Sequence, residues 1–145
     1  RQEASLYDIR TLKLKEGDDI IYIKRIRYAN DQPVIIEHVH LPYRQYAFLL
    51  DEDLENRSLY ATIEQHTGAN PETYCFVKLC LEASASTPEE SLFLDIPAGS
   101  PLFILKEEVI SDTGAPVHWT KQIMSGSYFK FNLSNEINHL SINID

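Results

Sequence analysis

Two segments of the chain, about 82 residues apart, carry the same pattern of apolar and polar positions. Each begins with a hydroxyl residue and an acid, continues through an alternating apolar pair and a glycine, and ends in Pro-Val. The matching positions are Ser5, Asp8, Leu12, Leu14, Gly17, Lys24 and Pro33 in the first segment, and Thr87, Glu90, Leu94, Ile96, Gly99, Lys106 and Pro116 in the second. A repeated pattern predicts a repeated structure, so we expect one helix-and-hairpin unit to occur twice.

Each copy opens with a helix-capping sequence. Ser5 is followed three residues later by Asp8, and Thr87 by Glu90. In such a capping box the hydroxyl accepts a hydrogen bond from a first-turn N–H, and the acid favours the helix N-terminus. The second copy also has Pro88 at the first helical position, where its missing N–H costs nothing. A short helix is therefore expected in each copy.

A long hairpin is predicted after each helix. The outgoing strands are expected at about 20–29 and 102–111, where Ile, Tyr, Leu and Phe are frequent. Polar turns follow, a three-residue loop at Asn30–Gln32 in the first copy and Asp112–Gly114 in the second. After Pro-Val each segment is expected to return as an antiparallel strand.

Further elements are predicted between the copies and after them. Ser58 begins a helix that runs to Gln65, and Gly68 ends it. Residues 74–83 alternate as a connecting strand does, and residues 141–144 are expected to form a short extra strand, at a sheet edge or in a dimer contact. The predicted fold class is α+β, an antiparallel sheet of five to six strands with packed helices.

Length and composition favour a single globular domain over residues 1–145. Hydrophobic residues make up 43% of the chain and charged residues 24%, and a chain of this length buries about two thirds of its unfolded surface. No apolar run approaches the ~18 residues of a membrane span, so no membrane partner is expected. The sole methionine is Met124, and we expect the chain to be part of a longer protein.

Charge and cysteine content narrow the class of partners. The formal net charge is −9, with 13 basic residues interspersed among 22 acidic ones. Such a domain repels nucleic-acid backbones, so it is not expected to bind DNA or RNA itself. Cys75 and Cys80 have the spacing of neither a zinc knuckle nor a redox pair. We expect a reducing, cytoplasmic setting, and no cofactor.

One predicted strand carries a basic pair. Arg25 and Arg27 share a strand face with the apolar residues before them. Two neighbouring guanidinium groups suit a phosphate or a carboxylate, although they can equally lie on a solvated edge or pair with acids. With a three-residue loop, Glu37 lies directly opposite Arg25. That position predicts a cross-strand salt bridge or a carboxylate that accepts hydrogen bonds from a ligand, and the two roles are compatible.

Two further positions are candidates for ligand contacts. Ser58 is expected at a helix N-cap with Tyr60 just behind it, where the N–H groups of the first turn can bind a phosphate. Plain capping is the commoner role of a lone serine. His118 precedes Trp119 and Thr120 in the return strand of the second copy, where a packing role is the alternative.

No motif for catalysis or metal binding emerges. His38 and His40 share a strand face, but no third ligand follows at a recognisable spacing, so a metal site is not expected. Ser84 and Ser86 lack a nucleophile elbow, and the chain has neither a glycine-rich phosphate loop nor a triad pattern. We expect a binding protein rather than an enzyme.

The ordered set of motifs resembles the UTRA domain, the effector-binding half of the HutC subfamily of GntR-type bacterial transcription regulators. The resemblance covers roughly residues 12–131. The matching residues are Leu14, Gly17, Lys24-Arg25-Ile26-Arg27, Asn30-Asp31-Gln32-Pro33, Glu37, Leu41-Pro42, Ser58-Leu59-Tyr60, Pro97-Ala98-Gly99-Ser100-Pro101-Leu102, Gly114 and Pro116-Val117.

The resemblance implies a chorismate-lyase-like fold, a homodimer, and a winged helix-turn-helix DNA-binding domain before residue 1. It implies that a small cytosolic metabolite binds here and changes the affinity of the full-length dimer for operator DNA. In members that respond to sugar phosphates, the residues at Arg25, Arg27, Ser58 and Tyr60 hold the phosphate, and the acid at Glu37 contacts the sugar.

The second half of the chain departs from the family pattern. His118 stands where such members commonly carry a glutamate, and Met124 where they carry a tyrosine. A neutral imidazole and a thioether cannot replace a carboxylate and a phenol in reading hydroxyl groups. We therefore expect a repressor's sensor domain for a sugar phosphate or related anion other than an amino sugar. The alternatives are a carboxylate sensor, a chorismate-lyase-like enzyme, or a dimerisation unit that has lost its ligand.

Overall fold

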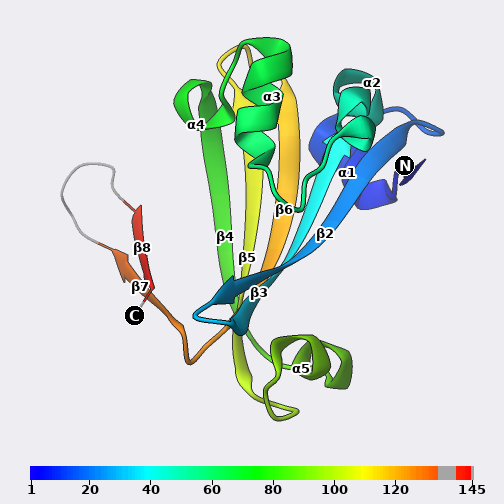
Figure 1. The fold of residues 1–145 in the computed structure, drawn as a ribbon. Coiled ribbons are helices and arrows are strands. Elements are labelled where there is room, and N and C mark those ends of the chain that lie inside the picture. Colours follow the sequence, from blue (N-terminus) through cyan, green and yellow to red (C-terminus); the bar gives the residue numbers. More distant parts are fainter. Residues whose placement is uncertain (134–139, 145) are drawn as a thin grey trace. The chain divides into compact units, whose positions relative to one another are not determined.

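The computed structural model describes residues 1–133 and 140–144 (Figure 1). Its helices are α1 (Leu6–Leu12), α2 (Tyr43–Tyr46), the 3-10 helix η1 (Ala47–Asp51), α3 (Leu59–Thr67), α4 (Pro71–Tyr74) and α5 (Pro88–Leu94). Its strands are β1 (Gln2–Glu3), β2 (Asp19–Ala29), β3 (Gln32–Pro42), β4 (Cys75–Ala85), β5 (Pro101–Ser111), β6 (Pro116–Ser125), β7 (Phe129–Leu133) and β8 (Leu140–Ile144).

The predicted antiparallel sheet and the duplication are confirmed. Six strands form one sheet in the order β1-β2-β3-β6-β5-β4. The first copy of the repeat is α1-β2-β3 and the second is α5-β5-β6. Because β3 and β6 are neighbours, the returning strands of the two copies meet in the middle of the sheet (Figure 1). The predicted tail strand is β8, which pairs antiparallel with β7.

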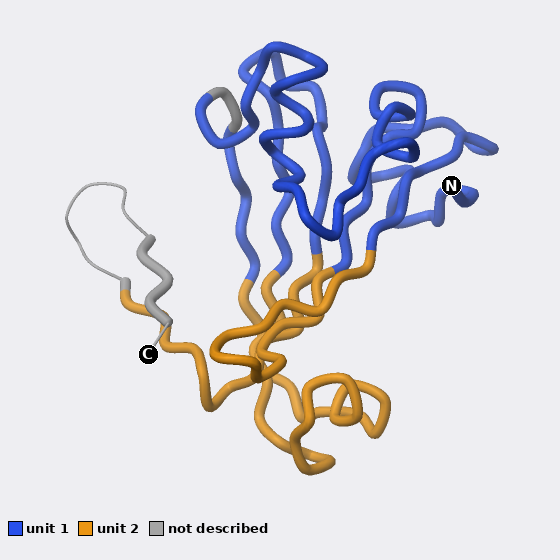
Figure 2. The backbone as a smooth tube through the Cα atoms, in the orientation of Figure 1, with its two compact units in different colours: residues 1–23, 38–80, 106–120 blue, residues 24–37, 81–105, 121–145 orange. Residues whose placement is uncertain are grey.

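The chain divides into two compact units (Figure 2). The first unit contains residues 1–23, 38–80 and 106–120, and the second contains residues 24–37, 81–105 and the described residues from 121 onward. Helices α1 to α4 therefore belong to the first unit and α5 to the second. The strands β2 to β6 each contribute residues to both units. The extent of the domain remains a prediction.

The first unit is packed on both faces of its strands. One cluster joins Ile21 of β2 to Leu59 and Ile63 of α3. The other joins Ile20 of β2 to Leu12 of α1. Since successive side chains of a strand point to opposite faces, the adjacent isoleucines of β2 supply one anchor to each layer. The second unit has its own clusters, one of which packs Leu94 of α5 against strand residues.

The helices begin where the capping sequences predict. The Ser5 and Thr87 side chains accept hydrogen bonds from the backbone N–H groups of Asp8 and Glu90, and both acids bond back to the cap residue. Helix α3 has Ser58 as its N-cap and Gly68, whose φ is 75°, as its C-cap. It runs to Thr67 rather than to the predicted Gln65.

The predicted three-residue loop of the first hairpin is wrong. Asn30 and Asp31 alone form the turn, with φ values of 49° and 62°, and Gln32 already belongs to β3. Two consecutive left-handed residues make a type I′ turn, whose twist matches that of the flanking strands. The predicted contact between Arg25 and Glu37 is nevertheless present, as an ion pair.

In the segment between the two copies of the repeat, α4 and the start of β4 differ from the predictions. Helix α4 begins at Pro71, and it includes Tyr74, which the alternating pattern had placed in a strand. The connecting strand β4 then runs over Cys75–Ala85. A four-residue helix has too few positions to show a helical period, so the sequence pattern gave no sign of it.

Asp8 has a role in the core that its repeat partner lacks. Its Oδ1 accepts a 2.8 Å hydrogen bond from Trp119 Nε1, and its Oδ2 accepts from the backbone N–H and the hydroxyl of Ser5 at 2.8 and 2.6 Å. Burial acts to raise the pKa of Asp8, but these hydrogen bonds and the nearby His40 outweigh it, so the pKa is lowered. Glu90, half-buried, makes only the capping bonds among the contacts described.

The two equivalent acids therefore provide a matched comparison. Asp8→Ala should lower the free energy of unfolding by about 3 kcal/mol, because it removes a cap and leaves the buried Trp119 N–H without an acceptor. Glu90→Ala removes a cap alone and should cost about 1 kcal/mol or less. Urea unfolding of both variants measures the difference, and equal costs would contradict the role assigned to Asp8.

Candidate functional site

An ion-pair cluster forms in the second unit from residues of the first hairpin. Arg25 Nε donates a 2.9 Å hydrogen bond to Glu37 Oε2, Arg25 Nη2 lies 2.8 Å from this oxygen, and Arg27 Nη1 lies 3.9 Å from it. Arg25 and Arg27 are two positions apart on β2, so their side chains point to the same face. The ion pair places the Glu37 side chain of β3 beside Arg25, and this contact was predicted from the sequence.

The two arginines differ in exposure. The side chains of Arg25 and Glu37 are 21% and 10% exposed, whereas that of Arg27 is 57% exposed. Two guanidinium groups share one carboxylate, so the cluster carries a net charge of about +1. At 3.9 Å, Arg27 Nη1 lies beyond hydrogen-bonding distance of Glu37. The cluster therefore combines an exposed cation with a fixed carboxylate that can accept hydrogen bonds.

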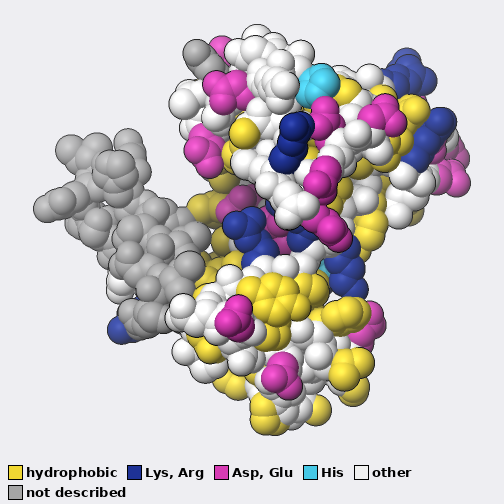
Figure 3. Space-filling view, in the orientation of Figure 1, with side chains coloured by type: hydrophobic (Ala, Val, Ile, Leu, Met, Phe, Trp, Pro, Cys, Tyr) yellow, Lys and Arg dark blue, Asp and Glu magenta, His cyan; other side chains and the backbone are white. Residues whose placement is uncertain are grey.

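The face seen in Figure 3 does not form a basic patch. Figure 3 shows Lys and Arg side chains mixed with Asp and Glu on the face in view. This distribution agrees with the net charge of −9. Attraction of an anion therefore depends on short-range contacts, since the long-range field of the domain is repulsive.

A second polar pair lies in the first unit. The hydroxyl of Tyr60, on α3, lies 2.7 Å from Nε2 of His118, on β6. His118 is 2% exposed, and burial lowers its pKa to about 4. The imidazole is thus neutral at physiological pH, with one donor and one acceptor nitrogen. Its Nδ1 has no hydrogen-bond partner in the part of the chain that the structure describes.

Thr120 is a neighbour that the sequence analysis did not select. It follows His118 by two residues on β6, which puts both side chains on one strand face. Thr120 is 4% exposed, and its Oγ1 also lacks a partner among the described residues. Buried hydroxyl groups are normally satisfied by protein, water or ligand. That both atoms are buried without a partner among the described residues could be detected only once burial was known.

The remaining predicted site residues have separate placements. The Ser58 side chain caps α3 by accepting from the Ala61 N–H. Met124 is 2% exposed and packs with Val34, Leu105 and Phe129 in the core of the second unit. Its placement favours a packing role, and a ligand contact for it remains a prediction. Within the first unit the structure joins Tyr60 to His118, and within the second it joins Arg25, Arg27 and Glu37.

The paired histidines of β3 take part in packing contacts. His38 Nδ1 lies 2.7 Å from the Tyr22 hydroxyl. His40 stacks on Trp119 with 3.9 Å between ring centroids, and its Nδ1 lies 2.9 Å from Asp8 Oδ1 without hydrogen-bond geometry. Burial lowers the pKa of His40, although Asp8 opposes the shift. Among the described residues, no three metal-ligating side chains gather in one place.

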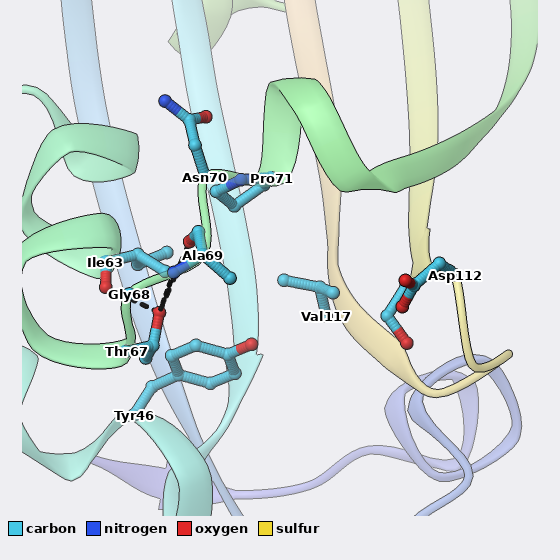
Figure 4. A pocket seen from close by; sticks show the side chains of 10 residues that line it. Tyr46, Ile63, Thr67, Gly68, Ala69, Asn70, Pro71, Asp112 and Val117 are labelled. Carbon is cyan, nitrogen blue, oxygen red and sulfur yellow. Dashed lines mark hydrogen bonds between the residues drawn. The ribbon is translucent and has the colours of Figure 1, made fainter.

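A cavity of about 300 Å³ lies in the first unit at the C-terminal end of α3 (Figure 4). It is lined by Tyr46, Ile63, Thr67, Gly68, Ala69, Asn70, Pro71, Ser111, Asp112 and Val117. None of the seven predicted site residues, all of which the structure describes, is among them. Asp112 is its one charged lining residue, so this cavity has no cation for a phosphate group.

The buried His118 predicts a loss of stability in mild acid. Unfolded His118 titrates near its ordinary pKa of 6.5, and the folded residue near 4, so the unfolded state takes up the proton first as the pH falls. This residue should remove about 1 kcal/mol of stability between pH 7.5 and pH 5.5. Urea unfolding at both pH values should show a smaller fall for His118→Asn than for the wild type. An identical fall would contradict the assignment.

The chain was compared with known proteins. The family model described as the UTRA domain matches residues 1–130. The HTH-type transcriptional repressor NagR of Bacillus subtilis is 33% identical over 109 residues, which are 75% of this chain and 43% of the repressor. The chain thus spans less than half the length of this curated relative.

Solved structures show the same fold. A GntR-family transcriptional regulator from Enterococcus faecalis has a TM-score of 0.81 at 23% identity, with 92% of this chain and 93% of that one covered. PhnF from Mycobacterium smegmatis has a TM-score of 0.83 at 18% identity, with 94% and 59% covered.

The named relatives are regulators of transcription rather than enzymes, in agreement with the non-enzymatic prediction. No helix of the described residues has the length and apolar character to span a membrane. The family match covers most of the chain and agrees with the ordered motifs and with the sheet. The chain therefore belongs to the UTRA domain family, the effector-binding domains of GntR-family transcription regulators.

Proposed function

We propose that this chain senses a sugar phosphate or a related small anion as part of a cytoplasmic repressor of the HutC subfamily. The cluster of Arg25, Arg27 and Glu37 is the observation that carries the proposal. A phosphate accepts hydrogen bonds from guanidinium groups, and a sugar donates them through its hydroxyls. A sugar phosphate thus offers a partner to the exposed cation and to the fixed carboxylate together.

The arrangement of charges suits an anion that arrives and leaves. Arg25 is already neutralised by Glu37, which leaves Arg27 as the more exposed guanidinium. A bidentate contact between Arg27 and the anion would add a charge-assisted interaction. It would leave the ion pair between Arg25 and the buried Glu37 intact. A carboxylate ligand can use the same contact, and it is therefore the alternative effector class.

Ser58 and Tyr60 are proposed to contact the phosphate together with the arginines, and His118 to contact the polar body of the effector. The support is chemical: His118 Nδ1 is buried without a hydrogen-bond partner among the described residues. A ligand hydroxyl or amide at that nitrogen would satisfy it. A neutral imidazole offers one donor and one acceptor nitrogen, whereas a carboxylate only accepts hydrogen bonds, and this difference argues against an amino sugar as the effector.

The effector is proposed to act on a homodimer through DNA-binding domains outside this chain. The net charge of −9 makes this domain itself a poor ligand for DNA. The 109 matched residues correspond to 43% of the related repressor's length, which leaves room there for a separate DNA-binding part. The effector need only bind one arrangement of the dimer more tightly than the other, since equal affinities would shift nothing.

Arg27→Ala is the variant that tests the anion site. A sugar phosphate at about 100 times its Kd should stabilise the wild-type chain by about 2.7 kcal/mol, or about 5–10 °C in Tm. Arg27→Ala should lose most of that shift with little change in its own Tm. The panel should contain hexose 6-phosphates, the free hexoses, inorganic phosphate and urocanate.

Arg44→Ala is the matched control, because Arg44 is 82% exposed and pairs with Asp18 in the first unit. It should keep the full ligand shift. A full shift in Arg27→Ala would exclude the proposed site, and a shift with urocanate alone would replace the phosphate by a carboxylate. Arg25→Ala, alone or with Arg27→Ala, is less informative, because it leaves the buried Glu37 without its main partner and should lower stability.

A double-mutant cycle tests whether one ligand uses both polar groups. Tyr60→Phe removes the hydroxyl that meets His118 and should weaken binding of the active sugar phosphate by about tenfold. If one ligand contacts both groups, combining Tyr60→Phe with Arg27→Ala should give a loss that differs from the product of the single losses. Calorimetric titration measures all four affinities. Strict additivity would indicate independent groups.

A further inference from the structure

The cavity at the C-terminal end of α3 contains none of the predicted site residues (Figure 4). All of its lining residues belong to the first unit. Ile63, Pro71 and Val117 are the buried part of the lining, and Thr67 and Asp112 are among its exposed part. Its volume of about 300 Å³ is roughly twice that of a cavity of about 150 Å³ that binds benzene. It therefore has room for one ring with a short side chain.

Most polar side chains of the lining already have partners within the chain. Thr67 Oγ1 donates at 2.8 Å to a carbonyl of its own helix. The Asn70 side chain donates to Glu64 at 3.0 Å and accepts at 2.9 Å from the backbone N–H two residues further on. Ser111 Oγ accepts at 3.1 Å from the backbone N–H four residues further on. Tyr46 is not without a partner either. These contacts fix the shape of the cavity.

Asp112 is the exception among the polar lining residues. It is exposed, and its carboxylate forms no hydrogen bond or ion pair with the part of the chain that the structure describes. Lys13 reaches the turn that follows, where its Nζ donates to the Gly114 carbonyl at 3.3 Å, but Lys13 does not line the cavity. An ionised carboxylate only accepts hydrogen bonds. The complementary group on a ligand is therefore a positively charged donor.

Two further features of the first unit favour a cation in this cavity. The carbonyl groups at the C-terminus of a helix carry a partial negative charge, and the cavity lies at that end of α3. The net charge of −9 attracts cations at long range, whereas it opposes the anion proposed for the ion-pair cluster of the first hairpin.

An organic cation fits the lining better than a metal ion does. Calcium and magnesium take about six or more oxygen ligands, and Asp112 is the one carboxylate of the lining. Among the described residues, no group of three metal-ligating side chains occurs. An organic cation can instead bury an apolar body in the cavity and keep its charged end at the exposed carboxylate, where water still solvates it.

We propose that this cavity is a second ligand site, which binds a small organic ammonium ion with its charged group at Asp112. The apolar or aromatic body of the ligand lies against Ile63, Pro71 and Val117. The cavity shares no residue with the ion-pair cluster of the first hairpin and has the opposite charge preference. The inference is therefore independent of the proposed phosphate site.

Probes that share one ring but differ in charge test the class of ligand. Phenethylamine is a cation at neutral pH, phenethyl alcohol is neutral, and hydrocinnamate is an anion. In an NMR titration of the isotope-labelled chain, phenethylamine should bind with a Kd of about 1 mM or below and shift the amide signals of Gly68, Ala69 and Ser111. The alcohol should bind about fivefold more weakly and the anion more weakly still. Added salt should weaken binding of the amine alone.

Three variants test the position of the ligand. Asp112→Asn keeps the shape of the side chain and should raise the Kd of phenethylamine by about fivefold, with no change for the alcohol. Asp31→Asn is the matched control, because Asp31 lies in the turn of the first hairpin and does not line the cavity. It should bind as the wild type does. Ala69→Phe, at an exposed lining position, should fill the cavity and prevent binding of both probes with little change in Tm.

Equal affinities for the amine and the alcohol, both insensitive to Asp112→Asn, would overturn the preference for a cation. Amide shifts that avoid the lining residues, or binding that survives Ala69→Phe, would overturn the site itself. The absence of any shift at probe concentrations well above the expected Kd would do the same. Each of these results leaves the phosphate-dependent thermal shift as a separate measurement.

Discussion

Neutralisation of a buried carboxylate is the constraint on which the polar centre of the second unit depends. Glu37 is 8% exposed, and a carboxylate is tolerated at such a position only when it is paired. Arg25 meets this requirement with a hydrogen bond and an ion pair to one carboxylate oxygen. The pairing holds the acceptor in place and commits Arg25 to it. Arg27, next on the same strand face, remains the more exposed guanidinium, so a single structural requirement produces the arrangement of charges that we propose binds an anion.

The first unit meets similar constraints by other means. Asp8 is 1% exposed and is stabilised by O–H and N–H donors from Ser5 and Trp119. His118 is kept neutral because burial lowers its pKa to about 4. The duplication supplies the same helix cap and hairpin twice, but Glu90, in the position equivalent to Asp8, is only half-buried. The backbone pattern is thus shared between the copies, whereas the buried polar groups differ and give each copy a distinct environment.

Much of the fold follows from local sequence. Both capping boxes, both hairpins and the N-cap of α3 were predictable, because each depends on residues within a few positions of one another. The first loop was predicted one residue too long, because Asp31 also adopts the left-handed conformation and Gln32 joins the strand. The role of Asp8 in the core was not predictable, since its partner Trp119 lies 111 residues away. Family membership was predictable because the motifs occur in order, although none of them is specific alone.

The sequence by itself determined the repeat, the strand faces and the grouping of Arg25, Arg27 and Glu37, because a hairpin brings together residues that are close along the chain. Only the tertiary structure decided which groups are buried. It placed Met124 in a core, joined Tyr60 to His118 across 58 residues, and left β4 at the edge of the sheet. Periodicity reports which face a side chain occupies, whereas burial depends on which distant element covers that face. The pattern of residues in one strand does not show which distant element packs against it.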